Sequence, residues 1–178
     1  MKTLEDQMSF YAAYHQDTRN KATHFVGVPA IAVSLMIPLG WLRLDAGGVT
    51  VTGALVVTSV LLAYYLLLDV PLGLAMCALF GLALRATDPI AQAPIATGLA
   101  WFLALFIGGW IVQLWGHVYE GRKPALVDNL VQVFVAPIFL AAEVFFALGY
   151  RPQLREAVQK RALEMRAAAL NSGARSAA

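Results

Sequence analysis

Apolar residues in this chain come in long, nearly unbroken runs that are separated by short polar segments. Four runs reach the length of about 20 residues that a helix needs to cross the hydrocarbon core of a bilayer. A fifth run contains Gln132, Pro137 and Glu143, and a carboxylate inside a bilayer must be protonated, paired or beside a cavity. We predict spans at 26–44, 49–68, 70–86 and 95–116, and a re-entrant segment, interfacial helix or fifth span at 130–149.

The basic residues between these runs predict the orientation of the chain. Lys and Arg near membrane ends mark the cytoplasmic side. They occur in residues 1–25, in 117–129 and after the fifth run, whereas the connections 45–48 and 87–94 have none. Four full spans place the N-terminus, the 117–129 segment and the tail together in the cytoplasm, and five spans would export the basic tail. We therefore predict four spans, in a bacterial inner membrane or an endoplasmic-reticulum-like membrane.

The last part of the chain is polar and strongly basic. In residues 153–170, apolar side chains recur every three or four positions among basic ones, which predicts an amphipathic helix on anionic headgroups. A solvated helix with frayed ends is the alternative. Residues 171–178 are predicted to be disordered, so residues 1–170 form a single membrane domain.

Composition narrows the class of protein further. The chain is 60% apolar and 13% charged, with a mean hydropathy of +0.66, whereas soluble domains carry about 25% charged residues. We predict an all-α integral membrane protein with about four transmembrane helices. The net charge of +2 is too small to suggest a nucleic-acid partner, and the single cysteine, Cys77, excludes an intramolecular disulfide. The polar first 25 residues do not resemble a signal peptide.

Three histidines lie in the polar segments at the edges of the apolar runs. His15, His24 and His117 are distant in sequence but are predicted to face the same side of the membrane. Imidazole is the commonest metal ligand in proteins, and a turn at residues 17–18 would let the first two rings meet. Neutral imidazoles with one carboxylate suit iron(II) and also zinc. We predict a metal site on the three histidines, with Glu120 or Asp128 as a further ligand or as a hydrogen-bond partner that fixes the rings.

Other polar residues beside the histidines are candidates for substrate contact. Arg122 and Lys123 contact either headgroups or an anionic substrate head, for which arginine offers a two-pronged donor. Asn20, one helical turn before His24, is a candidate for fixing a ring tautomer and for substrate binding, and Tyr14 is a further candidate for substrate contact. The predicted catalytic residues are Glu120, Asp128 and Arg122. Nucleotide-binding loops, nucleophile elbows and the HExxH zinc motif are absent from the sequence.

Two stretches resemble a known family. They are FYAAYHQDTRNKATHFVGVP near the start and QLWGHVYEGRKPALVDNLVQVFVAPIF near the end. The chain resembles the fungal 2-hydroxy fatty acid dioxygenases of the endoplasmic reticulum, an Mpo-like family formerly listed as a domain of unknown function. The resemblance implies an iron(II)-dependent enzyme of fatty acid α-oxidation that uses O2 to shorten a 2-hydroxy fatty acid by one carbon. It carries the family's histidines onto His15, His24 and His117, and the acyl chain would lie between the spans.

Two other functions are compatible with the same residues. One is a zinc-dependent membrane hydrolase that uses the three histidines, and the other is a non-enzymatic four-helix protein that binds lipids or acts as a scaffold. Membrane lipids are predicted partners in each case, and the sequence is compatible with a homo-oligomer. Metal content and turnover separate the three functions.

Overall fold

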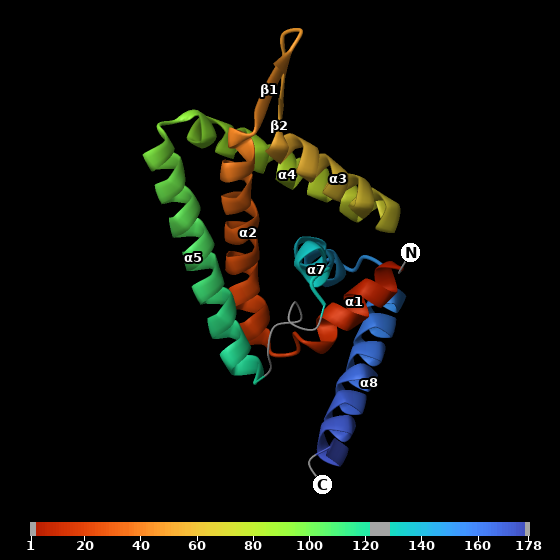
Figure 1. Cartoon of the computed structure of the whole chain (residues 1–178). Helices are drawn as coiled ribbons and strands as arrows, with labels where there is room; N and C mark the ends of the chain where they lie inside the picture. Colours follow the sequence, from red (N-terminus) through yellow and green to blue (C-terminus); the bar gives the residue numbers. More distant parts are fainter. Residues whose placement is uncertain (1–2, 122–128, 177–178) are drawn as a thin grey trace.

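The computed structural model describes residues 3–121 and 129–176, which are mostly helical and include one two-stranded hairpin (Figure 1). The predicted all-α class is therefore confirmed. In chain order the elements are α1 (Leu4–Ala13), α2 (Thr18–Trp41), β1 (Arg43–Ala46), β2 (Val49–Thr52), α3 (Gly53–Leu68), α4 (Val70–Gln92), α5 (Ile95–Glu120), α7 (Gln132–Ala147) and α8 (Pro152–Ser176).

Three helices, α2, α4 and α5, are long and apolar enough to cross a membrane. Helices α3 and α7 are also apolar but have 16 residues each, just under the range of about 17–25 residues for a span. Figure 1 shows α2 and α5 side by side and antiparallel, with the α3–α4 pair across one end of them. The second of the four predicted spans is thus a shorter helix than expected.

The connection between α2 and α3 departs from the prediction. Strands β1 and β2 pair antiparallel around Gly47 and Gly48, whose φ angles are 59° and 83°. A two-residue hairpin turn of this kind needs positive φ at both central positions, which glycine adopts without steric cost. The facing ends of the predicted spans 26–44 and 49–68 therefore form a hairpin. Helix α2 begins at Thr18, directly after the predicted turn at residues 17–18, because the side chain of Asp17 accepts a hydrogen bond from the Arg19 N–H. The helix then continues without a break into the predicted span.

The apolar run 130–149 forms α7, an interior helix that packs against α1, α2 and α4. Its side chains Val135, Ile138 and Ala142 are fully buried. Glu143, which was expected to need a partner, forms an ion pair of 3.0 Å with Lys21 of α2. Surrounding helices therefore cover much of this run.

Helix α8 packs along α1 (Figure 1). Its apolar residues Val158 and Ala162 are buried there, and Arg161 pairs with Asp6 of α1 at 2.6 Å. The apolar face that was expected on lipid headgroups is thus covered by protein, because α1 offers a complementary apolar face. The helix continues to Ser176, so residues 171–176 are helical rather than disordered.

Glycines let α2 and α5 approach closely at the ends that carry His24 and His117. A Cβ atom on Gly109 would lie 2.8 Å from Cγ1 of Ile31 and 3.0 Å from the carbonyl oxygen of Gly27. A Cβ atom on Gly116 would collide with the side chains of Thr23 and Asn20. Small residues at such contacts are typical of tightly packed helices in membranes.

Candidate metal centre

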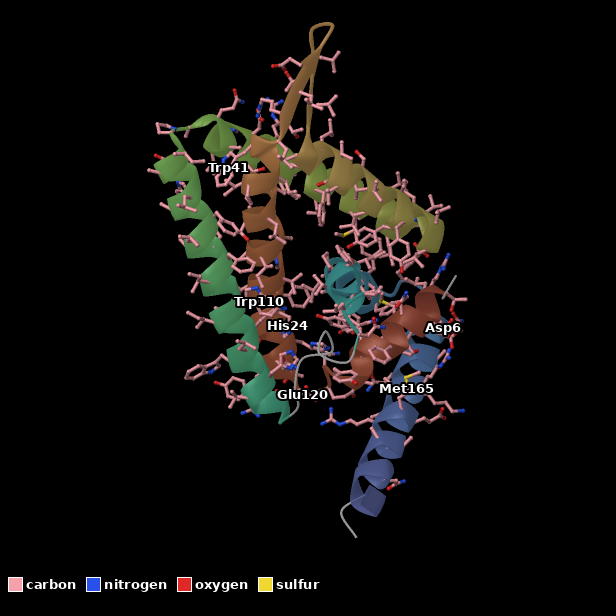
Figure 2. All side chains as sticks on the ribbon, viewed as in Figure 1. Asp6, His24, Trp41, Trp110, Glu120 and Met165 are labelled. Atoms are coloured by element: carbon pink, nitrogen blue, oxygen red, sulfur yellow. The ribbon has the colours of Figure 1, made fainter. Side chains whose placement is uncertain are left out.

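The three histidines converge although they come from three different elements. His15 lies in the turn after α1, His24 in the second turn of α2, and His117 in the last turn of α5. One ring nitrogen of each lies within 4.8 Å of the others, and all three side chains are buried. Figure 2 shows His24 and Glu120 at the same end of the α2–α5 pair, far from Trp41 at the opposite end. The turn between α1 and α2 thus brings His15 to His24, as the sequence suggested.

Hydrogen bonds to the backbone fix the tautomers of His15 and His24. Nδ1 of His15 donates to the Tyr11 carbonyl, and Nδ1 of His24 donates to the Asn20 carbonyl, both at 2.8 Å. A carbonyl oxygen only accepts, so each Nδ1 carries the proton and each neutral ring leaves an unprotonated Nε2. These two Nε2 atoms face each other at 3.1 Å. Two lone pairs at that distance repel unless a cation lies between them.

Burial, followed by repulsion from the neighbouring His24 ring, lowers the pKa of His15 well below its usual range. The ring is therefore neutral at physiological pH, as a metal ligand must be. A separation of 3.1 Å fits two nitrogens at about 2.1 Å from one ion, at an angle close to a right angle. Nitrogen ligands of this type suit iron and zinc alike. The three histidines thus have the chemistry and spacing to hold one divalent metal ion.

Glu120 supports the turn that carries His15. Its Oε2 atom accepts hydrogen bonds from the backbone N–H groups of Gln16 and Asp17, at 2.9 and 2.8 Å, and from the Asn20 amide at 3.2 Å. Its Oε1 atom pairs with Arg166 of α8. Both carboxylate oxygens are therefore engaged, and the metal-ligating group found among the described residues comprises only the histidines. In this structure Glu120 acts on the site through the turn.

The other predicted site residues are placed differently. Asn20 is buried and joins the site twice, through its carbonyl to His24 and through its amide to Glu120. Tyr14 ends α1 and packs against Phe10, with ring centroids 5.3 Å apart. The remaining candidates lie in the 122–128 segment, outside the described residues: Arg122, Lys123 and Asp128. The roles predicted for these residues stay predictions.

Two residues that support the histidines were not assigned to the site from the sequence. The Tyr11 ring stacks on His15 with a centroid distance of 4.1 Å and an interplanar angle of 6°. Its spacing of four residues from His15 is a helical signal that could have indicated this contact. Arg166, which pairs with Glu120, was treated only as one of the basic residues of the amphipathic helix predicted at 153–170. Nothing in the local sequence distinguishes it from the other arginines of that helix.

An apolar cavity extends from the histidines between the helices. The space among its lining residues is about 980 Å³, open solvent at the mouth included. Its walls come from α1, α2, α3, α4, α5 and α7, and the histidines lie at one end. The far end is formed by residues such as Met36, Leu39 and Phe80. A long apolar ligand with one polar end would match this distribution of side chains.

The family described as 2-hydroxy-palmitic acid dioxygenase Mpo1-like matches residues 1–148. This chain belongs to the Mpo1-like family. The 2-hydroxy-palmitic acid dioxygenase MPO1 of Saccharomyces cerevisiae is 37% identical over 160 residues, which cover 88% of this chain and 87% of the yeast protein. No solved structure matches the chain. The Mpo1-like match includes all three histidines and Glu120, whereas α8, which supplies Arg166, lies beyond it.

The close approach of α2 and α5 gives a first test of the site. We expect Gly116→Ala to separate the two helices at His24 and His117, and to lower metal affinity about 10-fold or more, because the new methyl group meets Asn20 and Thr23. Metal titration of purified protein measures this effect. Gly108→Ala is the matched control, since its Cβ atom would meet nothing within 4 Å, and equal metal affinity in the two variants would contradict the argument.

Proposed function

We propose that this protein is a membrane-embedded, iron(II)-dependent dioxygenase of fatty acid α-oxidation, which converts a 2-hydroxy fatty acid to the acid one carbon shorter. The observation that carries the proposal is the close approach of the His15 and His24 Nε2 atoms, 3.1 Å apart, at the end of an apolar cavity. Membership of the Mpo1-like family supports the same reaction class. A metal site that opened only to solvent would not favour a lipid substrate.

The proposed reaction balances without a further reductant. One 2-hydroxy acid and one O2 give the shortened acid, CO2 and water. The substrate loses four electrons as its C1–C2 bond breaks, and O2 takes them up. Iron(II), when bound, supplies the one-electron chemistry that allows O2 to react with an organic acid.

The chain's own residues position the reactants. The carbonyls of Tyr11 and Asn20 hold the Nδ1–H groups of His15 and His24, which directs both Nε2 atoms to one point. The apolar walls hold the acyl chain and exclude water from the reacting end. We propose that Arg122 or Lys123 offsets the charge of the substrate carboxylate and that Asp128 contributes at the same end.

Outward-facing side chains support embedding in a bilayer. Helices α4 and α5 expose large apolar residues such as Leu82, Ile111 and Val118, and exposed apolar patches of this kind mark membrane or protein contacts. The distribution of basic residues favours a cytoplasmic N-terminus and tail. The histidines then lie near the cytoplasmic surface of a bacterial inner membrane or an endoplasmic-reticulum-like membrane.

The length of the cavity predicts the length of the acyl chain. Met36 is 12 residues beyond His24 on α2 (36 − 24), which places it about 18 Å along the helix. A staggered chain advances about 1.25 Å per carbon for bonds of about 1.5 Å, so about 14 carbons fit that distance. Met36 also borders a second pocket, lined by Arg43 and Asp88. Met36 therefore separates the apolar cavity from a polar one.

We expect Met36→Trp to shorten the preferred substrate by several carbons. Because each methylene that no longer fits costs about 10-fold or more in discrimination, kcat/KM for 2-hydroxypalmitate should fall at least that much relative to 2-hydroxylaurate. Leu163→Trp, at a half-exposed position on α8, is the control for added bulk. An unchanged ratio in the Met36 variant would remove this residue as the end of the acyl site.

The proposed function is tested with protein purified anaerobically. The protein is incubated with iron(II) and 2-hydroxypalmitate, O2 is admitted, and the products are identified by mass. We expect pentadecanoate and CO2 in equal amounts, with no product when iron is chelated. Full zinc occupancy with hydrolytic activity would instead favour the hydrolase, and ligand binding without any turnover would favour a lipid-binding protein.

A further inference from the structure

A buried amide lines the same cavity as the histidines. Gln132 begins α7 and its side chain is 1% exposed. Its Nε2 atom donates to Oε1 of Gln7 at 3.4 Å, and Nε2 of Gln7 donates to the Tyr64 hydroxyl at 2.9 Å. These hydrogen bonds join the Gln132 amide to side chains of α1 and α3.

The oxygen of the same amide has no hydrogen-bond partner within the part of the chain that the structure describes. Buried polar atoms in folded proteins almost always have a partner, and an exception calls for a physical explanation. The cavity around Gln132 is walled mainly by Leu, Ile, Val, Ala and Phe side chains. Besides the histidines, its lining includes four side chains with donor groups, none of which is paired with this oxygen in the described structure: Tyr11, Thr58, Trp110 and Gln113. A donor that enters with the ligand would satisfy the oxygen.

We propose that Gln132 recognises the 2-hydroxyl group of the substrate, with its Oε1 atom accepting the hydroxyl proton in a hydrogen bond. This inference rests on the proposed function. A 2-hydroxy acid has one donor near its head, because its carboxylate and its acyl chain have none. An unsubstituted fatty acid or a 2-oxo acid leaves Oε1 unpaired.

The physical consequence is selectivity for the hydroxylated acid. A site that is built to pair with a substrate hydroxyl strongly rejects the analogue that lacks it, since a buried polar group then remains unsatisfied. The apolar walls bind the acyl chains of both acids equally well. Gln132 thus allows the protein to select the hydroxy acid from a membrane in which ordinary fatty acids are the competing ligands.

The test compares ligands with and without the hydroxyl group on proteins with and without the amide. Affinities for 2-hydroxypalmitate and palmitate are measured under nitrogen, so that no turnover occurs, on full-length wild type, Gln132→Met and Gln153→Met. Methionine is similar to glutamine in length and shape but lacks the amide. Gln153 is exposed on α8, so its variant is the matched control. The ratio of the two affinities, compared between variants with and without the amide, isolates the hydrogen bond between the substrate hydroxyl and Gln132.

We expect wild type and Gln153→Met to bind 2-hydroxypalmitate at least 10-fold more tightly than palmitate. In Gln132→Met the ratio should fall toward one, because 2-hydroxypalmitate loses its partner and palmitate no longer leaves a buried oxygen unpaired. Palmitate binding at least as tight as in wild type also shows that the variant is folded. If Gln132→Met does not fold, Gln132→Asn withdraws the oxygen by one carbon–carbon bond and should lower the same ratio. A full preference retained in the folded variant overturns this inference and leaves the proposed function standing. A wild-type protein that does not bind 2-hydroxypalmitate overturns the proposed function itself.

Discussion

Replacing His24 with alanine is expected to release the bound metal and to reduce turnover of a 2-hydroxy fatty acid at least about 100-fold. His24 contributes one of the two Nε2 atoms that face each other at 3.1 Å, so its loss leaves two ligands. Losing a partner outside the ligand set typically costs 10–100-fold in metal affinity or activity, and losing a ligand should cost more. Metal content and turnover of purified protein measure both effects.

Thermal unfolding provides an independent measure of the same substitution. A metal bound at 100 times its dissociation constant stabilises a protein by about 2.7 kcal/mol, which corresponds to about 5–10 °C in Tm for a chain of this size. We expect a chelator to lower the Tm of wild type by this amount and to leave that of His24→Ala unchanged. Lys160→Ala, at an exposed position on α8, should behave as wild type. A His24 variant with full metal content would exclude this ring from the site.

Replacing Glu120 with alanine is the second large expected effect. The substitution leaves the N–H groups of Gln16 and Asp17 without their acceptor and leaves Arg166 without its partner. Leaving a buried donor without its acceptor costs about 1–3 kcal/mol. The Glu120 side chain is fully buried, whereas the Arg166 side chain is 28% exposed, so the loss is expected to come mainly from the two N–H groups of the turn. Because the turn also positions His15, metal affinity should fall about 10–100-fold.

Two variants separate the role of this turn from a general loss of charge. Arg19→Ala removes the exposed ion pair with Asp17 and should cost less than about 1 kcal/mol. Arg166→Met removes the contact from α8 but keeps the hydrogen bonds of Glu120 to the turn, so its effect on metal affinity should be smaller than that of Glu120→Ala. Unchanged metal affinity in Glu120→Ala would show that the turn does not position His15.

The sequence allowed the metal-binding histidines to be predicted, but not all of the residues that hold them in place. His15, His24 and His117 stood out because they lie in the polar segments at the edges of the apolar runs, and because the predicted topology placed all three on one side. Their convergence also needed the sharp turn at Asp17, whose capping side chain is visible in the sequence. The contact between Glu120 and Arg166 could not be predicted from the sequence. The two residues lie on different helices, 46 positions apart, and no local pattern links them.

The fold differs from the prediction at the connection between α2 and α3 and at α8, where one sequence pattern allowed more than one structure. Val49 and Val51 suggested the start of a span, but Gly47 and Gly48 favour a hairpin turn, and residues 43–52 form a two-stranded unit. The apolar stripe of α8 was assigned to lipid, yet α1 covers Val158 and Ala162. An amphipathic pattern shows that a face is buried without showing what covers it.

X-ray absorption at the iron edge of anaerobically purified protein tests most sharply whether His15, His24 and His117 hold one iron ion at the end of the apolar cavity. We expect about one iron per chain, with imidazole scattering at about 2.1 Å that is reduced in each single histidine variant. Imidazole scattering unchanged in all three variants, or protein that retains zinc and has no iron-dependent turnover, would exclude an iron site on these histidines.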